Sequence, residues 1–133
     1  MSTIKTNTLT GTTSAGSIVV TGEGGSTTTN LQQGLAKMWA GTDGAGTPAV
    51  QDSLNNASVT DNGTGNYTFT FTNNMNNDDY SSLSGGERGS ENQSAISGHI
   101  DKTTSTHQHQ SKDDPGNAED MFEASYLVHG DLA

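Results

Sequence analysis

The residues in this chain best suited to chemistry are two histidines that flank one glutamine. His107 and His109 would lie on the same face of a strand, a spacing that can chelate a divalent metal, and His99 or Asp101 would complete the site. No apolar residues surround the pair in the sequence to form the shell that orients metal ligands. We therefore expect a solvated polar face. His107 and His109 stay candidate metal ligands, within one chain or near a three-fold axis shared by three copies.

Two pairs of adjacent carboxylates are the other candidates for chemistry, Asp78 with Asp79 and Asp113 with Asp114. Neighbouring residues on a strand point to opposite faces, so neither pair alone forms the two-carboxylate centre of a glycoside hydrolase. Both pairs are therefore expected to be solvated turn acids. No glycine pair precedes a Lys-Ser/Thr signature, and no serine stands in a Gly-X-Ser-X-Gly motif. The sequence predicts no enzyme and no cofactor.

Composition limits the classes of partner. The net charge is −10 with only five Lys and Arg, which argues against binding to nucleic acid or to an anionic membrane surface. Only 28% of the residues are hydrophobic, so a single copy has a small core. The polarity comes from Thr, Ser, Asn and Gly more than from charge and proline, which favours β-structure over disorder. There is no cysteine, and no segment has the length of a membrane-spanning helix.

Four segments organise the chain. Residues 1–26 are expected to be an extended attachment and trimerisation arm, because isolated apolar residues in a Thr/Gly-rich stretch are suited to pairing edge to edge with neighbouring subunits. Residues 27–40 are predicted to form a short helix, residues 41–48 a linker, and residues 49–133 a β-sandwich domain.

The predicted helix has an apolar stripe and good N-cap residues before it. About three turns are unstable alone, so the stripe must pack on copies of itself or on the chain's own sheet, and Trp39 can do both. Together the arm and the stripe give the expected oligomer interface. Its residues are Ile4, Leu9, Ile18, Val20, Leu31, Leu35, Met38 and Trp39.

The β-domain is predicted from one-sided strands. Residues 53–60 are interpreted as a strand, residues 61–66 as a glycine-rich turn, and residues 67–71 as a strand with three aromatic residues on one face. Met75 is expected to plug the end of the core, and residues 121–129 to form the closing strand. Residues 84–118 are unusually polar and short of apolar strand residues, and they are interpreted as solvent-facing edge strands or as ligand-contacting loops. The predicted core consists of Tyr67, Phe69, Phe71, Phe122, Tyr126 and Val128.

The fold class that follows is all-β. A small antiparallel β-sandwich is preceded by an extended N-terminal arm and one short helix, and the chain is expected to form a trimer, because interfaces between copies then replace a large interior.

Four stretches of the sequence resemble a known protein family. Residues 2–24, 29–37, 52–75 and 129–133 are similar to virion structural proteins of tailed phages, particularly marine ones, usually described as tail-fibre proteins. The resemblance implies a trimeric, fibre-like or knob-like virion component. It also implies that the N-terminal segment attaches to other virion proteins and that the β-domain faces outward.

The function expected from these observations is that of a non-enzymatic phage virion structural protein. It would be a short tail fibre or a fibre-tip attachment module, made in the host cytoplasm without a signal peptide and located on the virion as a homotrimer. Two alternatives stay open. One is a capsid-decorating head-fibre or cement protein. The other is a module that binds a host surface glycan, with Trp39, Tyr67 and Tyr80 as platforms for sugar rings.

Overall fold

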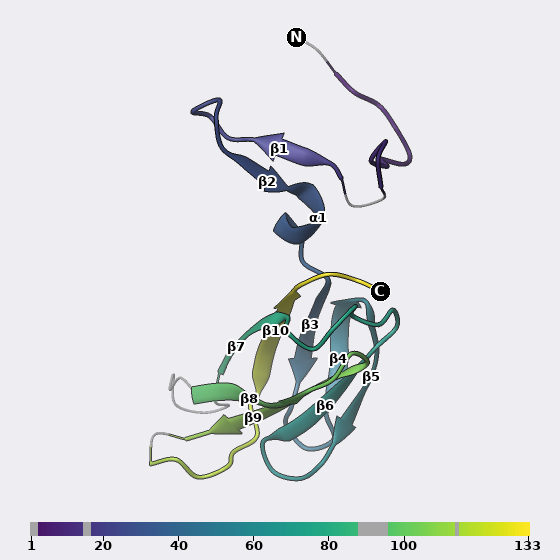
Figure 1. Ribbon diagram of the computed structural model, residues 1–133. Helices are drawn as coiled ribbons and strands as arrows, with labels where there is room; N and C mark the ends of the chain where they lie inside the picture. Colours follow the sequence, from purple (N-terminus) through teal and green to yellow (C-terminus); the bar gives the residue numbers. More distant parts are fainter. Residues whose placement is uncertain (1–2, 15–16, 88–95, 114) are drawn as a thin grey trace. The chain divides into compact units, whose positions relative to one another are not determined.

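The computed structural model describes residues 3–14, 17–87, 96–113 and 115–133. The chain divides into two compact units, Met1–Leu35 and Ala36–Ala133, shown in Figure 1. The boundary between the units follows Leu35, before the predicted linker at residues 41–48. That linker is wrong in its first part, because residues 41–43 belong to a strand, and the remainder is the loop of a hairpin.

The N-terminal unit contains a small hairpin and one turn of helix. β1 (Val19–Thr21) pairs antiparallel with β2 (Thr28–Asn30), and α1 (Leu31–Gly34) follows directly. The Asn30 side chain accepts a hydrogen bond of 3.2 Å from the Gln33 backbone N–H, which satisfies one of the unpaired donors at the helix start. Ile4, Leu9 and Val20 are exposed, so this unit buries little apolar surface of its own.

The predicted helix over residues 27–40 is confirmed only at Leu31–Gly34, because Thr28–Asn30 already form β2. α1 ends at Gly34, and Leu35 is already extended. Met38 and Trp39 lie in a strand, where Met38 pairs with Val128. The helical spacing of the apolar residues concealed a second period, since Met38, Ala40 and Thr42 alternate and all three are buried. Pairing with two neighbouring strands therefore overrides a weak helical preference.

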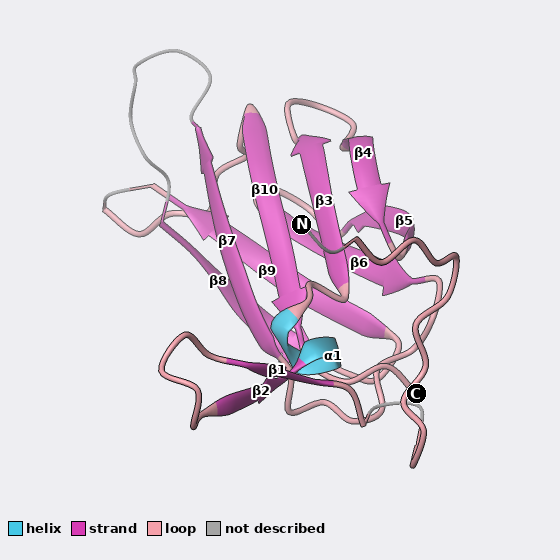
Figure 2. Ribbon diagram, turned by 90° about the horizontal axis from the view of Figure 1, so that it is seen from above, coloured by secondary structure: helices cyan, strands magenta, loops and turns pink. Residues whose placement is uncertain are grey.

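The second unit is an antiparallel β-sandwich, which confirms the predicted fold class. Its first sheet has the order β4-β3-β10-β7 and its second the order β5-β6-β9-β8 (Figure 2). The strands of the first sheet are β3 (Met38–Asp43), β4 (Ala49–Leu54), β7 (Ser81–Glu87) and β10 (Glu123–His129). Those of the second are β5 (Asn56–Asp61), β6 (Asn66–Phe71), β8 (Ile96–Lys102) and β9 (Thr106–Lys112).

A single residue connects the two sheets at one edge. The sequence predicted one strand over residues 53–60, but Asn55 has a φ of 57° and divides it into β4 and β5. Asparagine tolerates this left-handed conformation better than most residues. The Asn55 carboxamide also holds the neighbouring loop, because its Oδ1 accepts a 2.6 Å hydrogen bond from Asn73 N–H. The chain therefore passes from one sheet to the other at a sharp corner.

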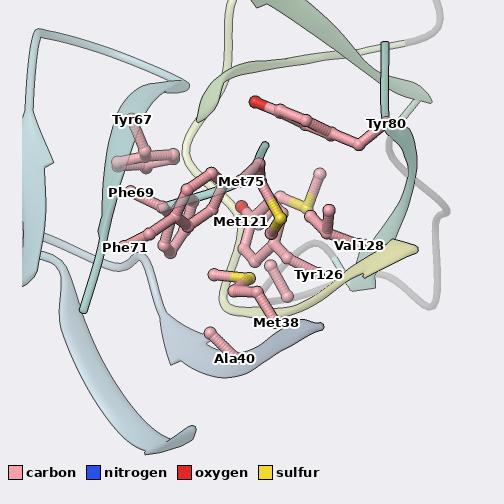
Figure 3. Close-up of a cluster of buried hydrophobic side chains, with 11 residues drawn as sticks. Met38, Ala40, Tyr67, Phe69, Phe71, Met75, Tyr80, Met121, Tyr126 and Val128 are labelled. Atoms are coloured by element: carbon pink, nitrogen blue, oxygen red, sulfur yellow. The ribbon is translucent and has the colours of Figure 1, made fainter. Parts of the chain in front are cut away.

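The core fills the space between the sheets with side chains from alternate strand positions (Figure 3). Tyr67, Phe69 and Phe71 of β6 are all buried, as the alternation predicted, and the Phe69 ring lies 4.3 Å from that of Tyr126. Met75 is also buried, which confirms its predicted place. The complete apolar core is Met38, Ala40, Tyr67, Phe69, Phe71, Met75, Tyr80, Met121, Ala124, Tyr126 and Val128.

Phe122 is an error in the predicted core, because its side chain is 47% exposed. β10 begins only at Glu123, so the alternation does not extend back to Phe122, whose N–H donates to the Glu87 carbonyl. Met121 fills the core position instead, and its sulfur lies against Gly86 of β7. A side chain at that glycine would collide with Met121.

The predicted turn at residues 61–66 is confirmed as the loop of the β5–β6 hairpin, and an aspartate from a distant loop fixes it. Asp120 Oδ1 accepts two hydrogen bonds of 2.7 Å, one from the Gly65 N–H and one from the Tyr67 hydroxyl. Gly65 has a φ of 67° and is packed against the Ser111 and Glu119 backbones, so only glycine fits there. The hairpin is thus tied to the loop that leads into β10.

Candidate functional site

A row of apolar side chains crosses the outer face of the first sheet. Register places Leu54 beside Trp39, Trp39 beside Leu127, and Leu127 beside Leu83, one residue from each of β4, β3, β10 and β7. These positions alternate with the buried ones, so their side chains face away from the core. Leu83 is 65% exposed, while Trp39 and Leu127 are half-buried. The row is therefore an apolar ridge at the surface.

Small residues form the next row along the same strands. Gly41, Ser125 and Gly85 are paired across β3, β10 and β7, two positions from the apolar row. A Cβ added at Gly85 would meet no atom within 4 Å, so the floor beside the ridge is open. The result is a groove of about 440 Å³, lined by Trp39, Ala40, Gly41, Leu83, Ser84, Gly85, Ser125, Tyr126 and Leu127.

Acidic side chains form the third row. Glu123 of β10 is paired with Asp43 on one side and with Glu87 on the other. Both glutamates are exposed, and Asp43 is half-buried with its Oδ1 accepting a hydrogen bond from Ala45 N–H. Since alternate residues on one face of a strand are about 7 Å apart, the acidic row lies about 13 Å from the apolar row. The acidic row therefore lies on the same face as the groove, beyond its floor of small residues and opposite the apolar row.

The two histidines predicted as candidate metal ligands are buried. His107 and His109 point inward from β9, where the His109 ring packs edge-on against Tyr126 with ring centroids 4.7 Å apart. The predicted solvated face is therefore wrong, and so is the interpretation of this segment as an edge strand or loop, because β9 lies between β6 and β8.

Burial determines the charge state of these imidazoles. Both ring nitrogens of His109 lack a hydrogen-bond partner among the described residues, and so does Nδ1 of His107. Desolvation lowers the pKa of each histidine from 6.5 to about 4, with a smaller contribution from the neighbouring histidines. At neutral pH both rings are therefore uncharged members of the core.

The structure does not assemble the proposed metal site. His99 is exposed on β8, and its ring centroid is 6.5 Å from that of His107, which is itself 6.4 Å from His109. Within the described part of the chain, no group of three or more His, Cys, Asp or Glu side chains is placed to hold a metal ion. Asp78 and Asp79 are exposed loop residues, Asp113 accepts two hydrogen bonds from Asn117, and Asp114 lies outside the described residues.

The predicted oligomer interface is divided by the structure. Met38 belongs to the core and is unavailable to another copy, which corrects its assignment. Trp39 lines the groove in the second unit. The other six residues lie in the N-terminal unit. Four are exposed, namely Ile4, Leu9, Val20 and Leu35, and two are half-buried, namely Ile18 and Leu31.

Sequence reasoning missed the groove because its residues come from three strands far apart in the chain. No local pattern marks it. The available signal was the alternation of residues 123–129, where the outward positions Glu123, Ser125 and Leu127 pass from charged to apolar.

No protein family model, no curated protein and no solved structure matches this chain. Within the described residues, no helix is long and apolar enough to cross a membrane.

Proposed function

We propose that this chain is a non-enzymatic structural protein of a phage virion, and that it assembles as a homotrimer through its N-terminal unit. One observation carries the proposal: the second unit has a core of its own, whereas the N-terminal unit exposes its apolar side chains. Ile4 is 86% exposed, and Leu9, Val20 and Leu35 are each at least half exposed. Because this unit is too small to bury its own apolar side chains, a partner surface is needed to remove them from water.

The short β1–β2 hairpin supports the same role. An isolated two-stranded hairpin is marginal in water, and unpaired strand edges are ready to pair with another chain. We propose that the arm pairs with neighbouring copies and with other virion proteins, and that the sandwich is displayed outward. A short tail fibre or fibre tip fits this arrangement, and a capsid-decorating protein would use the same two parts.

The glycan-binding alternative loses two of its three aromatic platforms. Tyr67 and Tyr80 are buried in the core, and their hydroxyls donate hydrogen bonds to Asp120 and to the Thr106 carbonyl, respectively. Of the three, Trp39 alone lines an open groove. Sugar binding therefore has less support than assembly.

The test compares the full chain with a variant that lacks residues 2–25. Multi-angle light scattering at micromolar concentration is expected to give three times the monomer mass for the full chain and the monomer mass for the deletion. Circular dichroism is expected to show the β-sheet signal in both. The double variant Ile4→Ser/Leu9→Ser should weaken the trimer, while Leu54→Ser, an exposed leucine of the second unit, should leave it intact.

Incorporation into particles tests the virion role separately. Mass spectrometry of purified virions should detect the full chain and not the deletion variant. A monodisperse, folded monomer of the full chain would contradict trimerisation. Normal occupancy of the deletion variant on virions would place the anchor in the β-domain instead.

A further inference from the structure

We propose that the groove on the outer face of β3, β10 and β7 docks a polypeptide segment that combines apolar side chains with lysine or arginine. The inference goes beyond the virion assignment and does not depend on it, because it rests only on the groove. It assigns a second contact surface to the molecule, located on the sandwich and not on the arm.

The apolar side of the groove supplies the contact area. Trp39, Leu127 and Leu83 lie next to one another across three strands, and Leu83 is the most exposed large apolar side chain of the sandwich among the described residues. Covering such side chains removes apolar area from water, which is the main favourable contribution to protein association. Tryptophan is also among the residues that contribute most at interfaces.

The floor of the groove allows the main chain of a bound peptide to come close to the sheet. Gly41 and Gly85 have no side chains, and Ser125 between them presents one small hydroxyl. A bound segment can therefore lie low across the strands, with one set of its side chains toward the ridge and another toward the acids.

The acidic side selects the charge of the occupant. No lysine or arginine among the described residues pairs with Glu87 or Glu123. All acidic residues of the chain except Glu23 lie in residues 36–133, so the sandwich carries the net charge of −10. A cationic segment is attracted to this field, whereas an acidic glycan or a nucleic acid is repelled. A second copy would bring the same acidic row and the same net charge, which disfavours self-association through this face.

The chain contains one tryptophan, so Trp39 fluorescence reports directly on the groove. The probe is a short capped peptide of alternating lysine and valine, titrated into the full-length protein. Two matched peptides serve as controls, one of alternating glutamate and valine and one of alternating lysine and serine. We expect a saturable change in Trp39 emission with the lysine–valine peptide, weakened by salt. Its affinity should exceed that of either control by about ten-fold or more.

Variants locate the binding. Leu83→Ser is expected to weaken binding by about ten-fold or more. Glu87→Gln and Glu123→Gln should each weaken it by about two- to five-fold, the range for exposed charge pairs. The matched controls Ile100→Ser and Asp79→Asn change an exposed isoleucine and an exposed acid elsewhere, and both should bind like the unmodified chain. The two glutamine variants alter only exposed side chains, so they keep the test valid if Leu83→Ser perturbs folding.

Three results would overturn the proposal. Equal binding of the lysine–valine and lysine–serine peptides would show attraction by net charge alone. A response of Trp39 to neutral oligosaccharides with none to the lysine–valine peptide would make the groove a sugar site. Emission that depends on protein concentration without any peptide, and that Leu83→Ser abolishes, would make the groove an interface between copies.

Discussion

The His109 ring lies edge-on against the Tyr126 ring, with centroids 4.7 Å apart and an interplanar angle of 76°, and is completely buried. His109 thus occupies a core position of the kind that a phenylalanine ring would fill. The arrangement is stable only while the imidazole is neutral, since no described residue supplies a partner for the proton on either ring nitrogen.

Stability should therefore fall as the pH is lowered. The unfolded chain binds a proton on each histidine near pH 6.5, but the folded chain does so only near pH 4, because burial lowers the pKa of His107 and His109. Between these values the unfolded state binds more protons, so the free energy of unfolding decreases as the pH falls. At pH 5 the loss is about 2 kcal/mol for each histidine, and it levels off below pH 4. Urea unfolding at several pH values measures it.

The variant His109→Phe tests the source of this pH dependence. It removes one titrating group and keeps an aromatic ring against Tyr126, so the loss of stability between pH 7 and pH 5 should shrink by about half. His129→Phe is the matched control, because that histidine lies outside the pair. An unchanged slope for His109→Phe would assign the acid sensitivity to other groups.

Truncation of Phe69 should be costly. Its side chain is fully buried and contacts Tyr126, so Phe69→Ala is expected to lower the free energy of unfolding by about 3 kcal/mol or more. Phe122→Ala removes the same atoms from a half-exposed site and should cost less than about 1 kcal/mol. Chemical denaturation of both variants gives the comparison, and equal costs would contradict the packing described for this core.

Two adjacent glycines of β7 should respond differently to an added methyl group. At Gly86 a Cβ would collide with the Met121 sulfur and lie 2.6 Å from the Glu123 carbonyl oxygen, whereas at Gly85 it meets nothing. Gly86→Ala should therefore destabilise by about 1–3 kcal/mol, and Gly85→Ala should be nearly neutral. Thermal unfolding of the pair decides the matter. Similar melting temperatures would show that β7 can shift to accept the side chain.

The strand at residues 67–71 was predictable because its signal is local. Tyr67, Phe69 and Phe71 alternate with threonines, and the glycines before them mark the turn. Met38 and Trp39 were misplaced because helical and strand periods coincide there, and only the pairing with β4 and β10 decides between them. Local patterns therefore predicted the fold class but not every element.

The histidine strand shows the limit of reasoning from polarity. Residues 106–112 contain no apolar residue, yet His107, His109 and Ser111 are buried. Their strict alternation was visible. The burial of these residues could not be predicted from the alternation, because histidine is classed as polar although a neutral imidazole packs like an aromatic ring. The groove could not be predicted for another reason, because its rows of residues form only when β3, β10 and β7 pair in register.

The pairing of Met38 with Val128 has a mechanical consequence. The beginning of β3 and the end of β10 lie side by side, so a load applied between them would open the ladder one residue pair at a time, as a zipper opens. The sandwich would therefore resist a force between these two strand ends only weakly, because the hydrogen-bonded pairs would bear the load in turn and not together.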